Sequence, residues 1–273
     1  MKNIPIFVLL KLKSQMKNKF TYSVFCFVFL GISIAAQSVK PEDTEIWTPE
    51  PPKVTPGNVV YQKPPSDAYI LFDGKNLNEW VSNNDNSKPA NWIVNKGILT
   101  VNKKAGNIET KKKFSNYQLH LEWMIAKNIS ENGQLKGNSG VFLASLGKGD
   151  PGYELQILDS YTNKTYVNGM AGSIYKQFPP LCNPMLPAGE WQTYDIIWTA
   201  PVFNNDGIVV KKARITVYLN GVLIQNNVEL EGPTQYIGKS SYAISHGASP
   251  IKLQAHNDPS EPISFRNIWI REL

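Results

Sequence analysis

The chain has 273 residues, of which 42% are hydrophobic, 11% aromatic and only 18% charged, a composition that excludes intrinsic disorder and coiled coils. Its net charge is +6, but five of its 28 basic residues lie in the first 36 positions, which hold no acid. The remainder therefore carries 23 basic and 22 acidic residues. This near balance removes the main argument for a nucleic-acid partner.

The first 36 residues have the layout of a secretion signal. Lys17 and Lys19 precede an apolar run that ends in small residues at Ala36. The run has roughly sixteen apolar or small residues, fewer than the ~20 of a membrane-spanning helix. We therefore expect residues 1–36 to be a cleaved signal peptide, with Met16 as an alternative start, and no stable membrane insertion after cleavage. A retained membrane anchor is the alternative.

Residues 37–67 are rich in proline. Prolines at this density are not tolerated by helices or central strands. We expect a Pro-rich linker or an extended arm in which Trp47 packs along the surface. The folded domain should then cover residues 68–273.

Beyond the arm, short apolar runs recur, each bounded by Gly, Asn or Pro. The predicted strands cover residues 68–72, 92–94, 98–101, 117–126, 140–144, 153–158, 193–199, 213–219, 222–225, 251–256 and 264–270. Asn220-Gly221 between two of them is typical of a tight hairpin turn, because both residues accept a positive φ. So many short strands, with few or no helices, predict an all-β sandwich of two antiparallel sheets.

Side chains alternate between two faces along three of these strands. The polar side chains that share a face are, strand by strand, Gln118, His120 and Glu122, then Glu154 and Gln156, then Lys252, Gln254 and His256. Such polar faces indicate a binding site or, equally well, a solvated outer face of a sandwich.

Eight short motifs in chain order carry a family resemblance. They are Asp73-Gly74, Gly137-Asn138-Ser139-Gly140, Tyr153-Glu154-Leu155-Gln156, Gly172-Ser173-Ile174-Tyr175, Gly189-Glu190-Trp191, Asn220-Gly221, Leu253-Gln254-Ala255-His256 and Phe265-Arg266-Asn267-Ile268. Together they resemble the 3-keto-disaccharide hydrolase domain family from about Tyr69 to Leu273. The resemblance implies a concanavalin A-like jelly roll that acts on oxidised sugars and is exported to the bacterial periplasm or the extracellular space.

A 3-keto sugar can be cleaved by proton abstraction, because the ketone acidifies the hydrogen at C2. Loss of the C1 substituent and addition of water then complete a hydrolysis, so the site needs a near-neutral base, an acid and a group that holds the enolate oxygen. His256 is the candidate base, because histidine titrates near neutral pH. Glu154 and Asp159 are the candidate acids, and Glu122 is a candidate catalytic partner across the sheet.

Several further polar residues are candidates for binding the substrate. They are Asn138, Ser139, Gln156, His120, Gln254 and Arg266. No cofactor is required by this scheme, although Glu154, Asp159 and His256 are alternative ligands for a divalent cation that would polarise the ketone.

We therefore predict an exported enzyme that cleaves 3-keto-glycosides or 3-keto-disaccharides. A non-catalytic carbohydrate-binding sandwich is the first alternative, since a fold does not fix a function. A retaining glycoside hydrolase is the second, and Gln156 argues against it because laminarinase-type enzymes carry an acid at that place. Six tryptophans of the sandwich are expected in the core, whereas exposed ones would favour carbohydrate stacking: Trp80, Trp92, Trp123, Trp191, Trp198 and Trp269.

Overall fold

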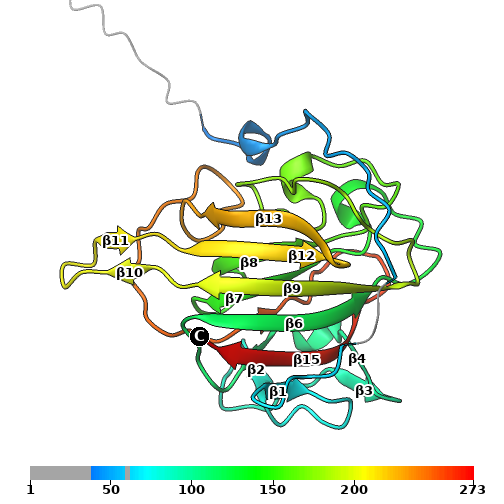
Figure 1. Cartoon of the computed structure of the whole chain (residues 1–273), viewed down its shortest axis with the longest axis horizontal. Helices are drawn as coiled ribbons and strands as arrows, with labels where there is room; N and C mark the ends of the chain where they lie inside the picture. The colour runs from blue at the N-terminus through cyan, green and yellow to red at the C-terminus, as the bar shows by residue number, and fades with distance from the viewer. Residues whose placement is uncertain (1–37, 59–61) are drawn as a thin grey trace, which may run out of the picture. The chain divides into compact units, whose positions relative to one another are not determined.

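In the computed structural model, which describes residues 38–58 and 62–273, the chain folds into a sandwich of two antiparallel sheets. The larger sheet (Figure 1) has the order β13 (Val222–Glu229), β12 (Arg214–Leu219), β9 (Trp191–Thr199), β6 (Tyr117–Met124), β15 (Ser264–Glu272), β4 (Ile98–Thr100) and β3 (Ile93–Asn95), with β1 (Tyr69–Phe72) also on β15. The smaller sheet has the order β2 (Trp80–Ser82), β5 (Ile108–Thr110), β14 (Lys252–Leu253), β7 (Ser139–Ser145) and β8 (Gly152–Ile157). The predicted all-β jelly-roll sandwich is confirmed.

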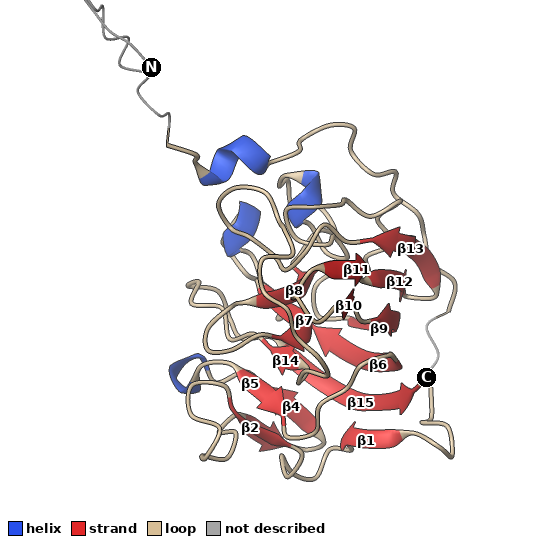
Figure 2. Ribbon diagram, turned by 90° about the vertical axis from the view of Figure 1, so that its left-hand side faces the viewer, coloured by secondary structure: helices blue, strands red, loops and turns tan. Residues whose placement is uncertain are grey.

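The core lies between these two sheets (Figure 2). Leu119, Leu121 and Trp123 of β6 face inward and are at most 1% exposed, and Leu155 and Ile157 of β8 are fully buried. Burying one such side chain stabilises the fold by about 1.5–3 kcal/mol. Five of the six tryptophans expected in the core are buried, and Trp191 is half-buried.

Short elements complete the sandwich. A small hairpin, β10 (Val202–Phe203) and β11 (Val209–Lys211), extends beyond the larger sheet. Among the described residues there are four 3-10 helices, which occupy Pro41–Thr44, Lys103–Ala105, Gly133–Leu135 and Val167–Gly169. At the predicted turn between β12 and β13, Asn220 and Gly221 have φ values of 53° and 76°. No helix in the described ranges is long and apolar enough to cross a membrane. The expected signal peptide, residues 1–36, lies outside the described residues.

Two sequence predictions need correction. Strands β2, β5, β10 and β11 were not predicted, because two or three residues are too few to show alternation. The strand predicted over residues 251–256 ends at Leu253. Beyond it, the backbone N–H of Ala255 donates to Oδ1 of Asn107 (2.8 Å), so that a side chain replaces the neighbouring strand as its partner. Gln254 and His256 are therefore in a loop.

The proline-rich segment is an extended arm over residues 38–58. Asn168, fully buried, holds it with two hydrogen bonds: Oδ1 accepts from the N–H of Ile46 (2.9 Å), and Nδ2 donates to the carbonyl of Thr44 (2.8 Å). Farther along, Lys53 forms a parallel bridge with Asn183. Nζ of Lys176 also donates to the carbonyl of Pro41 (2.7 Å), so the arm is hydrogen-bonded to the sandwich at three places.

Candidate active site

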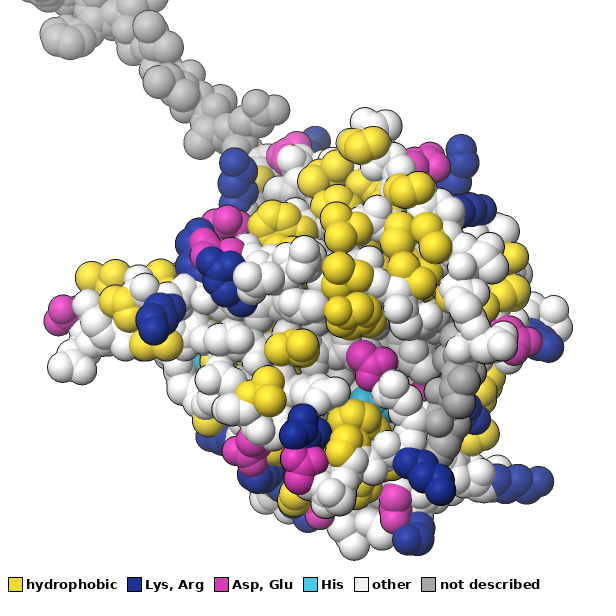
Figure 3. Space-filling view, in the orientation of Figure 1, with side chains coloured by type: hydrophobic (Ala, Val, Ile, Leu, Met, Phe, Trp, Pro, Cys, Tyr) yellow, Lys and Arg dark blue, Asp and Glu magenta, His cyan; other side chains and the backbone are white. Residues whose placement is uncertain are grey.

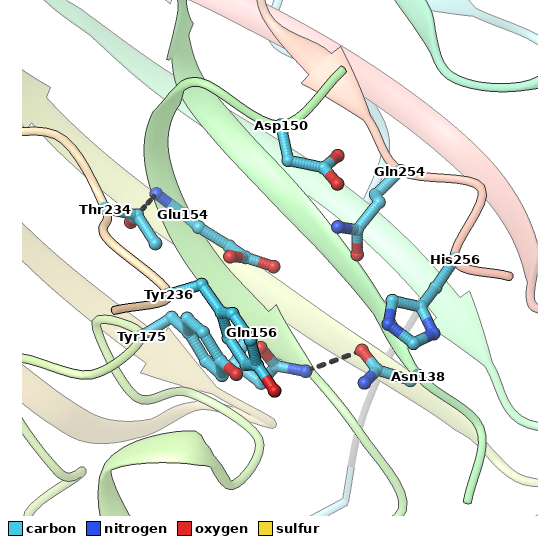
Figure 4. A pocket seen from close by; sticks show the side chains of 9 residues that line it. All are labelled: Asn138, Asp150, Glu154, Gln156, Tyr175, Thr234, Tyr236, Gln254 and His256. Atoms are coloured by element: carbon cyan, nitrogen blue, oxygen red, sulfur yellow. Dashed lines mark hydrogen bonds between the residues drawn. The ribbon is translucent and has the colours of Figure 1, made fainter. Parts of the chain in front are cut away.

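A pocket of about 350 Å³ opens on the face of the smaller sheet that points away from the core (Figure 4). Its walls come from β8, from the segment after β14, from the start of β7 and from three loops. The lining residues are Asn138, Asp150, Glu154, Gln156, Tyr175, Thr234, Tyr236, Gln254 and His256. Five of these were predicted as site residues: Asn138, Glu154, Gln156, Gln254 and His256.

Glu154 is the buried acid of this pocket. Glu154 is 6% exposed, and burial raises the pKa of its carboxyl to about 8. The negative charge of Asp150 also raises this pKa, whereas the positive charge of Lys252 lowers it. Glycine at position 140 on the adjacent strand makes room for this carboxyl, because a Cβ there would collide with Oε1 of Glu154. At neutral pH the carboxyl therefore holds a proton that it can donate.

His256 is the candidate base, and a buried carboxylate orients it. Nδ1 of His256 lies 3.0 Å from Oδ2 of Asp258. Burial acts to raise the pKa of Asp258, but hydrogen bonds from His256 and Ser260 outweigh it and lower the value to about 2. An ionised Asp258 accepts the proton of Nδ1, which leaves Nε2 of His256 with its lone pair available to a ligand.

Amide side chains form the floor of the pocket. Nε2 of Gln156 donates to Oδ1 of Asn138 (2.8 Å), and Nδ2 of Asn138 donates to the carbonyl of Gln134 (2.8 Å). Oε1 of Gln254 is buried and has no hydrogen-bond partner among residues 38–58 and 62–273. An unpaired buried acceptor is costly, so Gln254 is suited to receive a hydroxyl of a bound ligand.

Hydrogen bonds from Lys252 and Asn107 fix the loop that carries Asp150. Nζ of the buried Lys252 donates to the carbonyls of Gly149 (2.8 Å) and Pro151 (2.9 Å), and Nδ2 of Asn107 donates to Oδ1 of Asp150 (2.9 Å). Burial lowers the pKa of Lys252 to about 8. Lys252 therefore stays charged at neutral pH and fixes the loop instead of lining the pocket.

Tyrosine rings form one wall of the pocket. Tyr175 and Tyr236 lie beside each other in Figure 4, and Tyr236 is 61% exposed. Oγ1 of Thr234 accepts the backbone N–H of Glu154 (3.0 Å). A pyranose ring entering the pocket would meet apolar ring surface on this side and amides opposite.

Two predicted site residues are close in sequence to the pocket but do not line it. Oδ1 of the buried Asp159 accepts the N–H of Tyr161 (3.1 Å), and Oδ2 lies 3.5 Å from Nζ of Lys136. The hydroxyl of Ser139 donates to the backbone carbonyl of Gln254 (2.8 Å). Both side chains hold loops in place around the site.

Glu122, the expected catalytic partner of His256, and His120, an expected substrate-binding residue, do not line the pocket. These two lie on β6 of the larger sheet, with side chains away from the core, whereas His256 follows β14 of the smaller sheet. Nδ1 of His120 lies 2.7 Å from Oδ1 of Asp195. Arg266 of β15 donates from Nε to Oε2 of Glu122 (2.5 Å), an ion pair on that same outer face.

The three residues considered as metal ligands are not gathered at one point, because Asp159 lies outside the pocket that holds Glu154 and His256. Within the described ranges, no group of three His, Cys, Asp or Glu side chains could hold a metal ion.

Sequence reasoning missed five residues at the site. They are Asp150, Tyr175, Thr234, Tyr236 and Asp258. Only Asp258 carried a local signal, since an acid two residues after a candidate base is within hydrogen-bonding reach of it. The others lie on loops whose fold brings them to the pocket.

Comparisons with known proteins agree with this fold. Residues 67–271 match the family described as the 3-keto-alpha-glucoside-1,2-lyase-like domain. A protein of Bacteroides thetaiotaomicron named 3-keto-disaccharide hydrolase is 27% identical over 161 residues, which are 48% of this chain and 53% of that protein. The chain thus spans about half the length of this relative.

Solved structures from Parabacteroides distasonis are also similar. One, described as a candidate glycosyl hydrolase, is 50% identical with a TM-score of 0.72, and the match covers 85% of this chain and 96% of that one. Another is 24% identical with a TM-score of 0.53, and the match covers 76% of this chain and 99% of that one. At this identity the likeness is evidence for the shared fold alone. Because the family match covers well over half of the sequence, the chain belongs to the 3-keto-alpha-glucoside-1,2-lyase-like domain family.

Proposed function

We propose that this protein hydrolyses 3-keto-glycosides or 3-keto-disaccharides, with His256 as the base and Glu154 as the acid. One observation carries the proposal: an oriented imidazole and a carboxyl with a pKa of about 8 face the same pocket. Elimination beside a ketone needs this pair, a proton acceptor and a proton donor that are both competent near neutral pH. The family and the name of the Bacteroides relative support the substrate class.

The reaction proceeds in two stages. Nε2 of His256 removes the proton from C2, and the electron pair forms the C1–C2 double bond as the C1–O bond breaks. Glu154 gives its proton to the departing oxygen, so that an alcohol leaves and an enone remains. Water then adds, with its hydroxyl at C1 and its proton at C2, and the sum is a hydrolysis. We assign to the amide N–H group of Gln254, which lines the same pocket, the role of holding the oxygen at C3, where negative charge builds up as the C2 proton leaves.

An ordinary glycosidase is the second candidate, because Asp150 places another carboxylate in the pocket with Glu154. Two carboxyl groups are what direct displacement at C1 requires. The ketone separates the two functions: elimination needs it, and displacement does not.

The test compares matched glycosides with and without the 3-keto group, using purified protein with and without EDTA to detect a divalent cation. We expect turnover of the keto substrate alone, and incorporation of deuterium at C2 when the reaction runs in deuterated water. Glu154→Gln and His256→Asn should each lower kcat at least ~100-fold, the usual loss for an acid or base. Equal turnover of both glycosides, or cleavage without C2 exchange, would refute the elimination mechanism.

We also propose that the protein is exported. The basic residues and apolar run before Ala36 support cleavage of a signal peptide. The intact mass of the protein recovered outside the cytoplasm should lack residues 1–36, and recovery of the full chain in the membrane fraction would contradict this.

A further inference from the structure

We propose that the arm and the loop after β8 form a second carbohydrate site, which binds unoxidised pyranose units of an oligosaccharide. Between them lies a groove of about 390 Å³. Its lining shares no residue with the catalytic pocket, and the arm that forms one wall precedes residues 67–271, the part that matches the family. The proposal therefore stands apart from the reaction proposed above.

The exposure of Trp47 is the first observation that supports this second site. Trp47 is 54% exposed, whereas five of the other six tryptophans are at most 5% exposed. The indole ring carries the largest apolar surface of any side chain, so leaving half of it in water forgoes a large hydrophobic gain. Figure 3 shows further hydrophobic side chains gathered over the upper part of the molecule, where the arm runs.

The exposed indole is also held in place. Its Nε1 donates to Oε2 of Glu45 (3.2 Å), and Oε1 of Glu45 lies 3.4 Å from Nζ of the buried Lys176. The ring of Tyr166 contacts Trp47 edge to face, with centroids 6.0 Å apart. Because the preceding residue, Ile46, is bound to the sandwich, the indole is oriented before any ligand arrives, which reduces the entropy lost on binding.

The rest of the groove suits a sugar. Tyr161, 42% exposed, provides a second aromatic surface. Glu50, Lys53 and Lys164 line the groove and are exposed, so their charged groups can bind sugar hydroxyls. A pyranose ring presents C–H groups on its faces and hydroxyls at its edge, so it can stack on an aromatic ring while its hydroxyls bind the polar side chains.

The experiment titrates the inactive His256→Asn protein with hexasaccharides of glucose (α-1,4, β-1,4 and β-1,3), mannose and xylose. We expect at least one to bind saturably by calorimetry and to change tryptophan fluorescence. Trp47→Ala and Tyr161→Ala should weaken that binding at least tenfold, and Trp47→Phe should restore part of it. Tyr218→Ala, which removes an exposed aromatic from the larger sheet, is the matched control and should bind normally.

In the otherwise wild-type protein, Trp47→Ala should leave turnover of a small 3-keto-disaccharide within about twofold. Absence of binding by all five hexasaccharides, or equal affinity in Trp47→Ala, would overturn the proposal. Competition by a 3-keto-disaccharide would assign the hexasaccharide to the catalytic pocket and would also overturn it. Failure of the proposed reaction alone would leave the binding result intact, so the two ideas are tested separately.

Discussion

At the scale of single residues, Asp258 determines which nitrogen of His256 is available. Its carboxylate binds Nδ1, and the side chain is itself fixed by the backbone N–H of Ser260 (2.8 Å) and by Nζ of Lys103 (3.3 Å). Asp258 does not line the pocket, so it is a positioning residue. Its negative charge should also stabilise the imidazolium that forms when His256 takes a proton.

Asp258→Asn should therefore lower kcat at least ~100-fold while KM changes little, because the substituted amide loses the charge but keeps the size. Nitrogen NMR of His256 should show a proton on Nδ1 in the wild type and a mixture of tautomers in the variant. Lys103→Met, which disturbs the same loop without touching the imidazole, is the control. An equal loss of rate in that control would mean that Asp258 only holds the loop.

The raised pKa of Glu154 predicts how the rate depends on pH. Because burial raises its pKa to about 8, the carboxyl is protonated at neutral pH and ionised above that value. If it donates a proton to the leaving oxygen, kcat should fall as pH rises through about 8. Glu154→Gln should lack this fall. A rate that instead rises through pH 8 would identify Glu154 as a base or nucleophile.

At the scale of elements, the strand pair β7–β8 sets the geometry of the acid. Gly140 of β7 pairs with Gln156 of β8, and its carbonyl accepts the backbone N–H of Gln254 (3.0 Å). Gly140 thus contacts both β8, which carries Glu154, and the segment after β14, which carries Gln254. Its lack of a side chain is what leaves space for the carboxyl of Glu154.

Gly140→Ala should displace that carboxyl and lower kcat at least ~100-fold, since small misplacements of catalytic groups have effects of this size. The fold should survive, because Gly140 does not have the positive φ that an alanine would avoid. Gly57→Ala, in the arm with open space around it, is the control. Near-normal activity of Gly140→Ala with a normal thermal melt would show that Glu154 tolerates movement.

The strands could be predicted wherever alternation ran over five or more residues, as in β6, β8 and β12. Alternation also predicted that Glu154 and Gln156 share a face. It could not identify the sheet to which a strand belongs, and this is why Glu122 of β6 was grouped with His256. Tyr236 and Asp150 could not be found at all, because loop paths depend on contacts such as those of Lys252 with two backbone carbonyls.

At the scale of the whole molecule, the buried carboxyl of Glu154 makes the stability of the fold depend on pH. The pKa of Glu154 is near 4.5 in an exposed chain and about 8 in the fold, so the folded state holds the proton more tightly. Its favourable contribution is complete below pH 4.5 and is lost as pH rises towards 8. Lys252 acts in a different window, because its lowered pKa of about 8 affects stability between 8 and 10.5.

Glu154→Gln should therefore become more stable relative to the wild type as pH rises from 5 to 8. At about 1.4 kcal/mol per pKa unit, the difference over this range is at most about 4 kcal/mol. Denaturant unfolding of both proteins at pH 5, 6.5 and 8 measures it, with Gln156→Glu as a control that adds an acid at the neighbouring position and should change in the opposite direction. The same difference at all three pH values would mean that the carboxyl is solvated, and Glu154 would then lack the protonated form that the proposed reaction requires.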